Sequence, residues 1–315
     1  MAVTAPVVVG GDTTATAQGG ASRGYRKGDA KAAIPFLTPG AIGFLAFTLF
    51  PVFASLAMSF FDWPVLGSPT FTGFGNYVEL FTTDDTFRTA LLNTLVFVVL
   101  YVPINIVLSL GLAAWISPRI KGRRFYRVVF FIPAVTPMVG NAVVFGLLLT
   151  PNGLIDSAMK SLFGVGAPNF LGSTSWALPA VVMMSVWQGF GYNLLVFSAA
   201  MDAVPPSLTE AASIDGAGTF RQFFSVVLPL LSPSIFFATV LTLISSFQVF
   251  TQAYVLTGGG PGSSTTTLVM YLYQSGFQFF RLGFASAIAW VLFVIIMFIT
   301  GLQFLAQKKW VHYDQ

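Results

Sequence analysis

The sequence predicts an all-α integral membrane protein with six transmembrane helices and a cytoplasmic loop between the fourth and the fifth. Of its 315 residues, 55% are hydrophobic and 8% are charged, whereas soluble domains carry about 25% charged residues. Six stretches of about 20 or more residues contain no Asp, Glu, Lys, Arg or His, and a helix of that length crosses roughly 30 Å of hydrocarbon. A polar segment, residues 210–218, separates the fourth stretch from the fifth.

Each uncharged stretch is interpreted as one transmembrane helix. In chain order they cover residues 34–61, 91–117, 128–151, 176–201, 233–257 and 282–307. Pro51, Pro103 and Pro133 fall inside three of them, which predicts local kinks where the proline removes a backbone donor.

The positions of Lys and Arg predict the orientation. Twelve of the 15 precede the first span, follow the sixth, or lie between the second and third or the fourth and fifth. The positive-inside rule therefore places both termini and the 210–218 segment in the cytoplasm. Residues 1–33 are expected to be a disordered cytoplasmic tail, residues 34–308 the six-helix domain, and residues 309–315 a cytoplasmic C-terminal tail.

Several kinds of chemistry find no support in the sequence. It has no Cys and one His, His312, and it lacks the Gly-rich phosphate loop that ends in Gly-Lys-Ser/Thr. None of the spans contains a titratable Asp, Glu or His, which argues against proton coupling but leaves sodium coupling open. Energy for pumping would have to come from another subunit.

The polar segment carries dense signals for two short helices. Pro205 and Pro206 end the preceding helix, and Ser207 with Glu210 predicts a capping box at the start of a helix that runs to Gly216. Thr219 with Gln222 predicts a second capping box. The simplest interpretation is a plain connector, but this density of signals favours a surface that meets a partner.

Three motifs resemble those of the permease subunits of bacterial ABC importers of the carbohydrate-uptake type. The first is Glu210-Ala211-Ala212, followed by Asp215-Gly216-Ala217 and Leu228-Pro229. The second is Phe74-Gly75-Asn76-Tyr77, and the third is Thr257-Gly258-Gly259-Gly260-Pro261, which continues to Tyr271. The resemblance covers residue 34 to the end and favours the first of the two permeases of the maltose, glycerol-phosphate and multiple-sugar type.

The resemblance implies a non-catalytic subunit of a larger complex in the bacterial inner membrane. A second permease would share the pathway, two cytoplasmic ATPase subunits would bind ATP and Mg, and an extracytoplasmic solute-binding protein would deliver the solute. This chain would need no cofactor or metal of its own. The polar loop would be the coupling helix that docks on the ATPase, through Glu210, Ala211, Ala212, Asp215, Gly216 and Ala217.

Uncharged polar and aromatic side chains in two spans suit a neutral, hydroxyl-rich solute, because sugars are bound by amides, hydroxyls and aromatic faces. The expected pathway residues are Gln188, Gly189, Tyr192, Phe247, Gln248, Thr251 and Gln252. Each of them could instead join helices, as Gln, Asn and Thr do in membranes. Asn93, Asn105 and Asn141 are interpreted as such helix-joining residues or as residues at span ends.

Two other functions remain as alternatives. A stand-alone channel or sodium-coupled carrier for a neutral solute would leave the polar loop without a purpose. A membrane enzyme would need clustered His, Cys or carboxylates, and Asp202, Glu210 and Asp215 come nearest to that. The importer permease is the prediction.

Overall fold

The computed structural model describes residues 27–116, 120–308 and 310–311 and divides the chain into two units, residues 1–53 and 54–315. The first unit holds α1 (Lys27–Phe44), a π-helical turn η1 (Leu45–Leu49) and the start of α2 (Phe50–Met58). Helix α1 begins ahead of the predicted start at residue 34, and the rest of the predicted tail lies outside the described residues.

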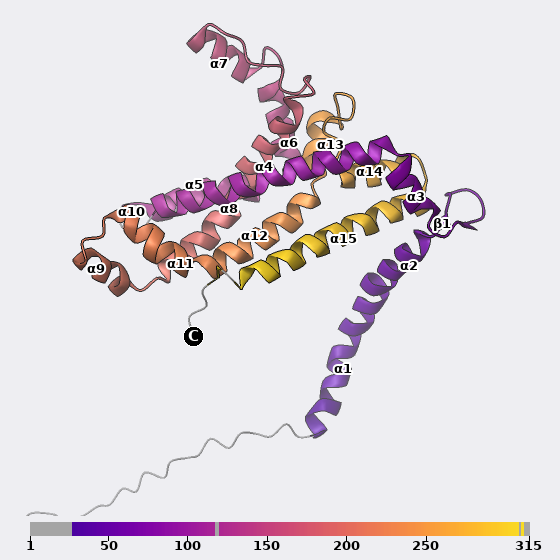
Figure 1. Cartoon of the computed structure of the whole chain (residues 1–315), viewed down its shortest axis with the longest axis horizontal. Coiled ribbons are helices and arrows are strands. Elements are labelled where there is room, and N and C mark those ends of the chain that lie inside the picture. The colour runs from indigo at the N-terminus through magenta and orange to yellow at the C-terminus, as the bar shows by residue number, and fades with distance from the viewer. Residues whose placement is uncertain (1–26, 117–119, 309, 312–315) are drawn as a thin grey trace, which may run out of the picture. The chain divides into compact units, whose positions relative to one another are not determined.

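The second unit is a helical bundle with a two-stranded hairpin (Figure 1). Its first elements are the end of α2, β1 (Phe61–Asp62), β2 (Thr70–Phe71), α3 (Gly75–Thr82), α4 (Asp85–Trp115), α5 (Arg123–Val135), α6 (Met138–Leu149), α7 (Leu154–Phe163) and α8 (Ala177–Asp202). The antiparallel strands pair Phe61 with Phe71 and Asp62 with Thr70.

The remaining elements contain two further π-helical turns. They are α9 (Pro206–Ile214), α10 (Thr219–Gln222), η2 (Phe223–Val227), α11 (Leu228–Leu230), α12 (Ser232–Phe247), α13 (Thr251–Thr257), α14 (Leu268–Tyr273), η3 (Gln274–Gln278) and α15 (Leu282–Gln307). Helices α9 to α11 lie at one end of the bundle, and α3 with the hairpin lies at the other (Figure 1).

Five of the described helical segments are long and apolar enough to cross a membrane. A sixth is found if the pair 219–230 and 232–247, bent by 68°, counts as one span. The predicted sixth span coincides with α15, and the fourth agrees with α8 within one residue. Helix α4 starts before the predicted residue 91, because Asp84 caps it by accepting a hydrogen bond from the Phe87 amide at 2.9 Å.

Two predicted spans are interrupted rather than continuous. The predicted span 128–151 breaks at Thr136, which is extended (ψ 144°) between α5 and α6. Pro137 explains this, because a proline pushes the residue before it out of the helical region. The helix continues past Pro133, which lies inside α5, so the span is interrupted at Thr136 and not at the proline predicted to kink it. The predicted span 233–257 breaks at residues 248–250, between α12 and α13.

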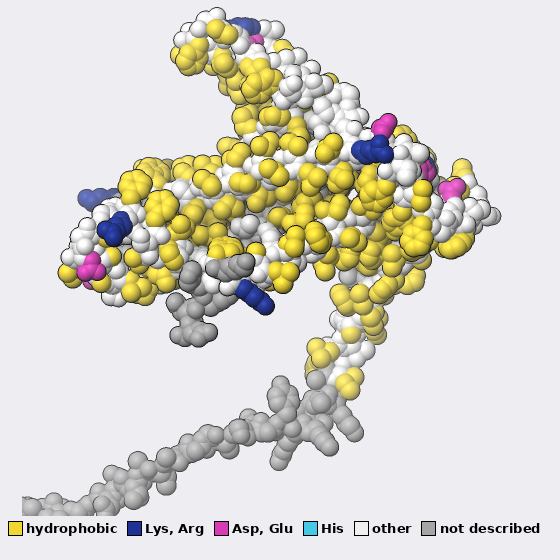
Figure 2. Space-filling model, in the orientation of Figure 1, with side chains coloured by type: hydrophobic (Ala, Val, Ile, Leu, Met, Phe, Trp, Pro, Cys, Tyr) yellow, Lys and Arg dark blue, Asp and Glu magenta, His cyan; other side chains and the backbone are white. Residues whose placement is uncertain are grey.

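The core of the bundle is centred on α4 and α8. These two helices lie against each other along much of their length, and α8 is the most buried candidate span of those described. Apolar residues of α4, α12, α14 and α15 form one cluster around Phe87, Phe247 and Phe284. Hydrophobic side chains cover the flank of the bundle, and charged ones gather mainly towards its ends (Figure 2), as expected where lipid surrounds the middle.

A close approach of α8 to α5 depends on Gly191. A Cβ atom at this position would lie 2.8 Å from the carbonyl oxygen of Phe130 and 3.2 Å from the Cβ of Ala134. Small residues allow membrane helices to approach closely in this way. The contact sets α8 against the end of α5, just before the break at Thr136.

Candidate functional site

A cavity of about 710 Å³ lies between α4, the α5–α6 break, α8 and the α12–α13 break. That volume is within the range of small-molecule sites, about 300–1,000 Å³. Among the described residues that line it, none is Asp, Glu, Lys, Arg or His; the lining is made of aliphatic, aromatic, amide and hydroxyl side chains.

Helix α8 supplies three of the predicted pathway residues to this cavity: Gln188, Gly189 and Tyr192. Gln188 is 7% exposed, and its Nε2 donates to the carbonyl oxygen of Thr136 at 3.2 Å. Its Oε1 is buried without a hydrogen-bond partner among the described residues. Tyr192 is 55% exposed, and its ring makes an edge contact with Phe131. The Nε2 atom of Gln188 thus ties α8 to the α5–α6 break, while its Oε1 atom remains an unused acceptor.

The α12–α13 break supplies three more predicted residues: Gln248, Thr251 and Gln252. Phe247 is different, because it is 1% exposed, packs with Leu243 and Leu268 in the main apolar cluster, and does not line the cavity. The prediction for Phe247 is therefore corrected. Helix α12 ends at Phe247. The Phe247 side chain belongs to the apolar core, whereas the next residue, Gln248, lines the cavity.

Several cavity residues were not among the predicted pathway residues. Phe97 and Tyr101 come from α4, whose spacing of four places them on one face, but that helix has no polar run to draw attention to it. Asn193 is visible as a polar residue next to Tyr192, whereas Thr242 is a single hydroxyl within an apolar run. The other polar or aromatic lining residues missed are Ser185, Phe237, Ser245, Ser246 and Phe250.

A polar network joins three helices beside the cavity. The Nδ2 of Asn193 donates to Asn105 Oδ1 at 2.7 Å and to Thr242 Oγ1 at 2.8 Å, which links α8 to α4 and α12. Ser109 donates to the carbonyl oxygen of Phe190 at 3.0 Å. The prediction that Asn105 joins helices is confirmed by these bonds.

The other two predicted helix-joining residues also bond backbone or side-chain groups of other segments. Asn93 donates to the carbonyl oxygens of Ser263 and Thr266, at 2.7 and 3.0 Å. Asn141 donates to Thr136 Oγ1 at 2.7 Å, across the α5–α6 break. Asn141 thus bridges the α5–α6 break, as a helix-joining residue does, whereas Asn93 ties α4 to the segment between α13 and α14.

The polar loop forms two short helices with a bend at Gly216, as predicted. Gly216 has φ +77°, and the Ala217 amide donates across it to the carbonyl oxygen of Ala212 at 2.9 Å, closing the end of α9. The Gln222 Nε2 donates to Ser213 Oγ at 2.8 Å and to the Ala217 carbonyl at 2.7 Å, so α10 is tied back to α9.

Neither predicted capping box is present. Helix α9 has Pro205 at its N-cap, and Ser207 lies inside the first turn. Proline at the first helical position makes an early start favourable, which removes the Ser207 hydroxyl from the cap. Helix α10 has Gly218 at its N-cap, and no side chain caps it. Gln222 reaches back as the motif predicts, but as a donor to other groups.

The loop presents apolar side chains that the described chain leaves uncovered. Ile214 is 88% exposed and Phe220 82%, and Glu210, Ala211 and Asp215 are also exposed. Nearby, Arg127 and Arg123 bind Asp202 at 2.9 and 3.1 Å, which fixes the start of α5 to the end of α8. Among the described residues, no three His, Cys, Asp or Glu side chains could hold a metal ion.

Comparison with known proteins accounts for the motifs. Residues 106–311 match the family described as binding-protein-dependent transport system inner membrane component. The chain belongs to this family. A probable ABC transporter permease protein, YesP of Bacillus subtilis, is 37% identical over 93% of this chain and 95% of its own length. LacF, the lactose transport system permease protein of Rhizobium radiobacter, is 30% identical over 87% and 93%.

The fold of a solved permease also matches. A chain of the bacterial alginate ABC transporter, in complex with a periplasmic protein that holds an alginate pentasaccharide, has a TM-score of 0.79. It is 24% identical, and the match covers 90% of this permease and 96% of that chain. The protein is thus a multi-pass, inner-membrane permease subunit of an ABC importer.

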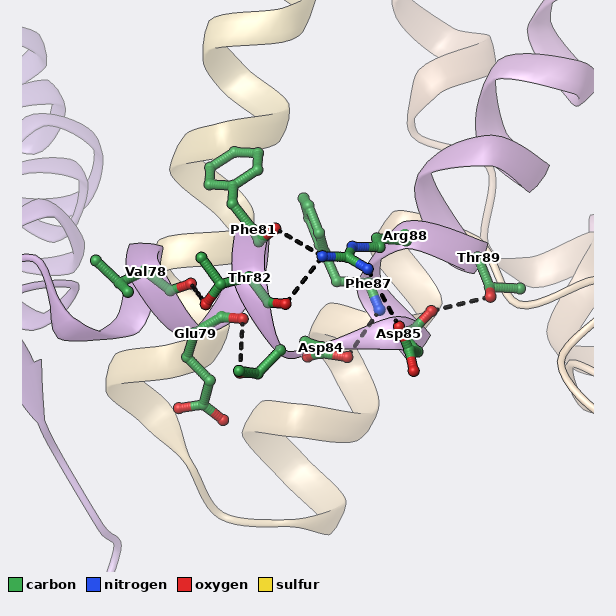
Figure 3. A network of polar contacts seen from close by, with 10 residues as sticks. Val78, Glu79, Phe81, Thr82, Asp84, Asp85, Phe87, Arg88 and Thr89 are labelled. Atoms are coloured by element: carbon green, nitrogen blue, oxygen red, sulfur yellow. Dashed lines mark hydrogen bonds and ion pairs between the residues drawn. The ribbon is translucent and has the colours of Figure 1, made fainter.

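In this permease the Phe74–Tyr77 motif locks α3 to the preceding hairpin. Asn76 Nδ2 donates to the carbonyl oxygens of Ser59 and Phe61, both at 2.9 Å, and the Tyr77 hydroxyl lies 2.7 Å from Ser59 Oγ. Arg88 donates to the carbonyl oxygens of Phe81 and Thr82 at the end of α3 (Figure 3). A cation at a helix C-terminus is favourable.

The third motif is tied to the same end of the bundle. Tyr271 donates its hydroxyl hydrogen to Asp84, the cap of α4. Burial, and then this hydrogen bond, raise the pKa of Tyr271, so it stays protonated and donates. Arg281 forms a two-pronged ion pair with Glu79 at 2.9 and 2.7 Å and lies over the Phe284 ring. Residues of two of the three motifs, Asn76, Tyr77 and Tyr271, therefore hold this end of the bundle together.

Proposed function

We propose that this permease forms part of the pathway for a neutral saccharide, delivered by an extracytoplasmic binding protein. The observation that carries this is the 710 Å³ cavity with amide, hydroxyl and aromatic lining and no charged residue among those described. A sugar hydroxyl needs donors and acceptors, and its apolar face suits an aromatic ring. The lactose permease relative supports the same class of solute.

In this proposal Gln188, Gly189, Tyr192, Gln248, Thr251 and Gln252 contact the solute. Their supporting evidence is their position around one cavity, although they come from two helices far apart in sequence. Two of them, Gln248 and Thr251, flank a helix break, and broken helices often line the sites of transporters.

The energy would come from partner subunits. A second permease completes the pathway, and two cytoplasmic ATPase subunits hold ATP and Mg, while this chain is non-catalytic. Its loop docks on an ATPase through Glu210, Ala211, Ala212, Asp215, Gly216 and Ala217. The exposed apolar residues beside them, Ile214 and Phe220, support a partner surface rather than a plain connector.

The orientation follows from the loop. If α9 and α10 meet an ATPase, their end of the bundle faces the cytoplasm, together with the Arg123–Asp202 and Arg127–Asp202 pairs. The distribution of Lys and Arg supports the same side for both termini, the cytoplasm. The end that carries α3, the hairpin and the Arg281–Glu79 pair faces outward.

Reconstitution tests the proposal. Proteoliposomes would hold this permease with its second permease and ATPase subunits, and the binding protein would be added outside with radiolabelled lactose, maltose or raffinose. We expect ATP-dependent accumulation of at least one saccharide, and none when the permease is alone. Accumulation by the permease alone, or accumulation of glycerol 3-phosphate in preference to all three saccharides, would contradict it.

Two loop variants test the coupling. Gly216→Pro should distort the bend and Glu210→Lys should reverse a contact charge, so each should reduce ATP-driven uptake at least tenfold while the chain still inserts. Ser225→Ala, an exposed change on the following turn, is the matched control and should transport normally. Normal uptake by both loop variants would assign the loop to a connector.

A further inference from the structure

The aromatic wall of the cavity on the α4 side is a stacked pair. Tyr101 lies on Phe97 with ring centres 5.3 Å apart and planes 14° apart. Phe97 is 1% exposed, so it holds the Tyr101 ring from behind, while both residues line the cavity. The ring therefore has a fixed place at the wall.

The hydroxyl end of Tyr101 is fitted to Gly189. A Cβ atom at Gly189 would collide with the Tyr101 hydroxyl oxygen, and it would lie 3.3 Å from the Cζ atom that carries this oxygen. It would also lie 3.0 Å from Asn105 Nδ2. Gly189 is in a helix and needs no unusual backbone angle, so the absence of a side chain serves the hydroxyl group of Tyr101.

The hydroxyl is held there with its hydrogen unused. Asn105 Nδ2 donates to the Tyr101 oxygen at 3.4 Å, a long bond in which tyrosine is the acceptor. No acceptor for the Tyr101 hydrogen is found among the described residues. On the facing helix α8, the buried Gln188 Oε1 lacks a donor. A cavity with one unused donor and one unused buried acceptor is incomplete without a ligand, because buried polar groups are normally paired.

We propose that Tyr101 is a specificity-determining residue of the pathway, which donates its hydroxyl hydrogen to a hydroxyl of the saccharide. A hydroxyl can donate and accept at once, so the same ligand could also donate to Gln188 Oε1. Gly189 acts as a positioning residue, since it leaves the space in which the Tyr101 hydroxyl lies. This inference rests on the proposed function and adds α4 to a site otherwise built from α8 and the α12–α13 break.

The test uses the complete reconstituted transporter and four variants of this chain: Tyr101→Phe, Gly189→Ala, the two combined, and Tyr126→Phe. Tyr126 lies in α5, makes edge contacts with Trp115 and Phe125, and does not line the cavity, so it is the matched control for loss of a tyrosine hydroxyl. Uptake is measured with whichever of lactose, maltose and raffinose the wild-type complex accumulates fastest.

Tyr101→Phe should raise KM about three- to tenfold, as expected for one neutral hydrogen bond, and change the maximal rate less than twofold. Gly189→Ala should raise KM more, because the ring must move. Added to Tyr101→Phe, it should cost less than it does alone, because the oxygen with which it collides is gone and only the close contacts with Asn105 Nδ2 and the ring carbon remain. Tyr126→Phe should leave KM unchanged.

An unchanged KM in Tyr101→Phe would overturn the inference, and so would an equal effect of Gly189→Ala in both backgrounds. Loss of assembled complex at unchanged KM, measured by size-exclusion chromatography in detergent, would assign the hydroxyl to packing and also overturn it. A wild-type complex that accumulates none of the saccharides would overturn the proposed function first. Wild-type uptake with an unaffected Tyr101→Phe variant would overturn this inference alone.

Discussion

The two helix breaks beside the cavity have different causes. At the first, Pro137 favours an extended conformation at Thr136. The Thr136 carbonyl then accepts a hydrogen bond from Gln188, and its hydroxyl oxygen accepts one from Asn141. At the second, residues 248–250 contain neither proline nor glycine, and the Val249 carbonyl accepts a hydrogen bond from Thr267 Oγ1 at 2.8 Å. The first break combines a local proline with side chains that bind Thr136, whereas the second has no proline and is held by a distant side chain.

The largest loss of stability is expected when the hydroxyl of Thr267, which holds the second break, is replaced by a methyl group. Thr267→Val would leave the buried Val249 carbonyl without its donor and remove the side-chain cap of α14, so we expect a loss of about 1–3 kcal/mol of stability. The thermal midpoint of the purified complex in detergent measures it. Thr239→Val is the control, because its hydroxyl binds only a carbonyl within α12. Equal shifts in both would show that the second break stands without Thr267.

A smaller effect is expected at Asn141, which supports the first break from the side. Asn141→Ala removes bonds to Thr136 Oγ1 and to the Pro133 carbonyl at 3.3 Å and should cost about 1–2 kcal/mol. The same thermal measurement applies. A loss larger than that of Thr267→Val would mean that the first break, too, depends chiefly on side chains.

The smallest effect should come from Pro137→Ala. The Thr136 carbonyl and hydroxyl remain bonded to Gln188 and Asn141, so the break should persist and stability should change by less than about 1 kcal/mol. Uptake by the reconstituted complex should stay within twofold of wild type. A large loss of uptake at normal stability would show that the proline itself shapes the pathway.

The same contrast explains what the sequence could predict. The uncharged run of α15 needs no partner to be recognised, and its predicted bounds match the structure. The break at 248–250 depends on Thr267, and burial of Phe247 depends on α14 and α15; neither relation leaves a local signal. For the same reason six of the seven predicted pathway residues line the cavity, while the α4 wall with Tyr101 was missed.

The capping boxes failed for a related reason. Ser207 and Glu210 have the right spacing, but the helix starts at Pro206 with Pro205 as its N-cap, so the cap precedes Ser207 by two residues. A local motif predicts well only where no stronger local constraint competes. Gly216 had no competitor, and its positive φ angle is as expected.

The Gln222 side chain joins α9 and α10 at a fixed angle. Gln222 is the last residue of α10, and its amide is bonded to Ser213 in α9 and to Ala217 in the bend, so the angle between the two helices is braced from the inside. Beyond the brace, residues 219–230 meet α12 at 68°. A force applied near Ile214 would therefore move α9 and α10 as one unit. The movement would be passed to the start of α12, whose other end lines the cavity.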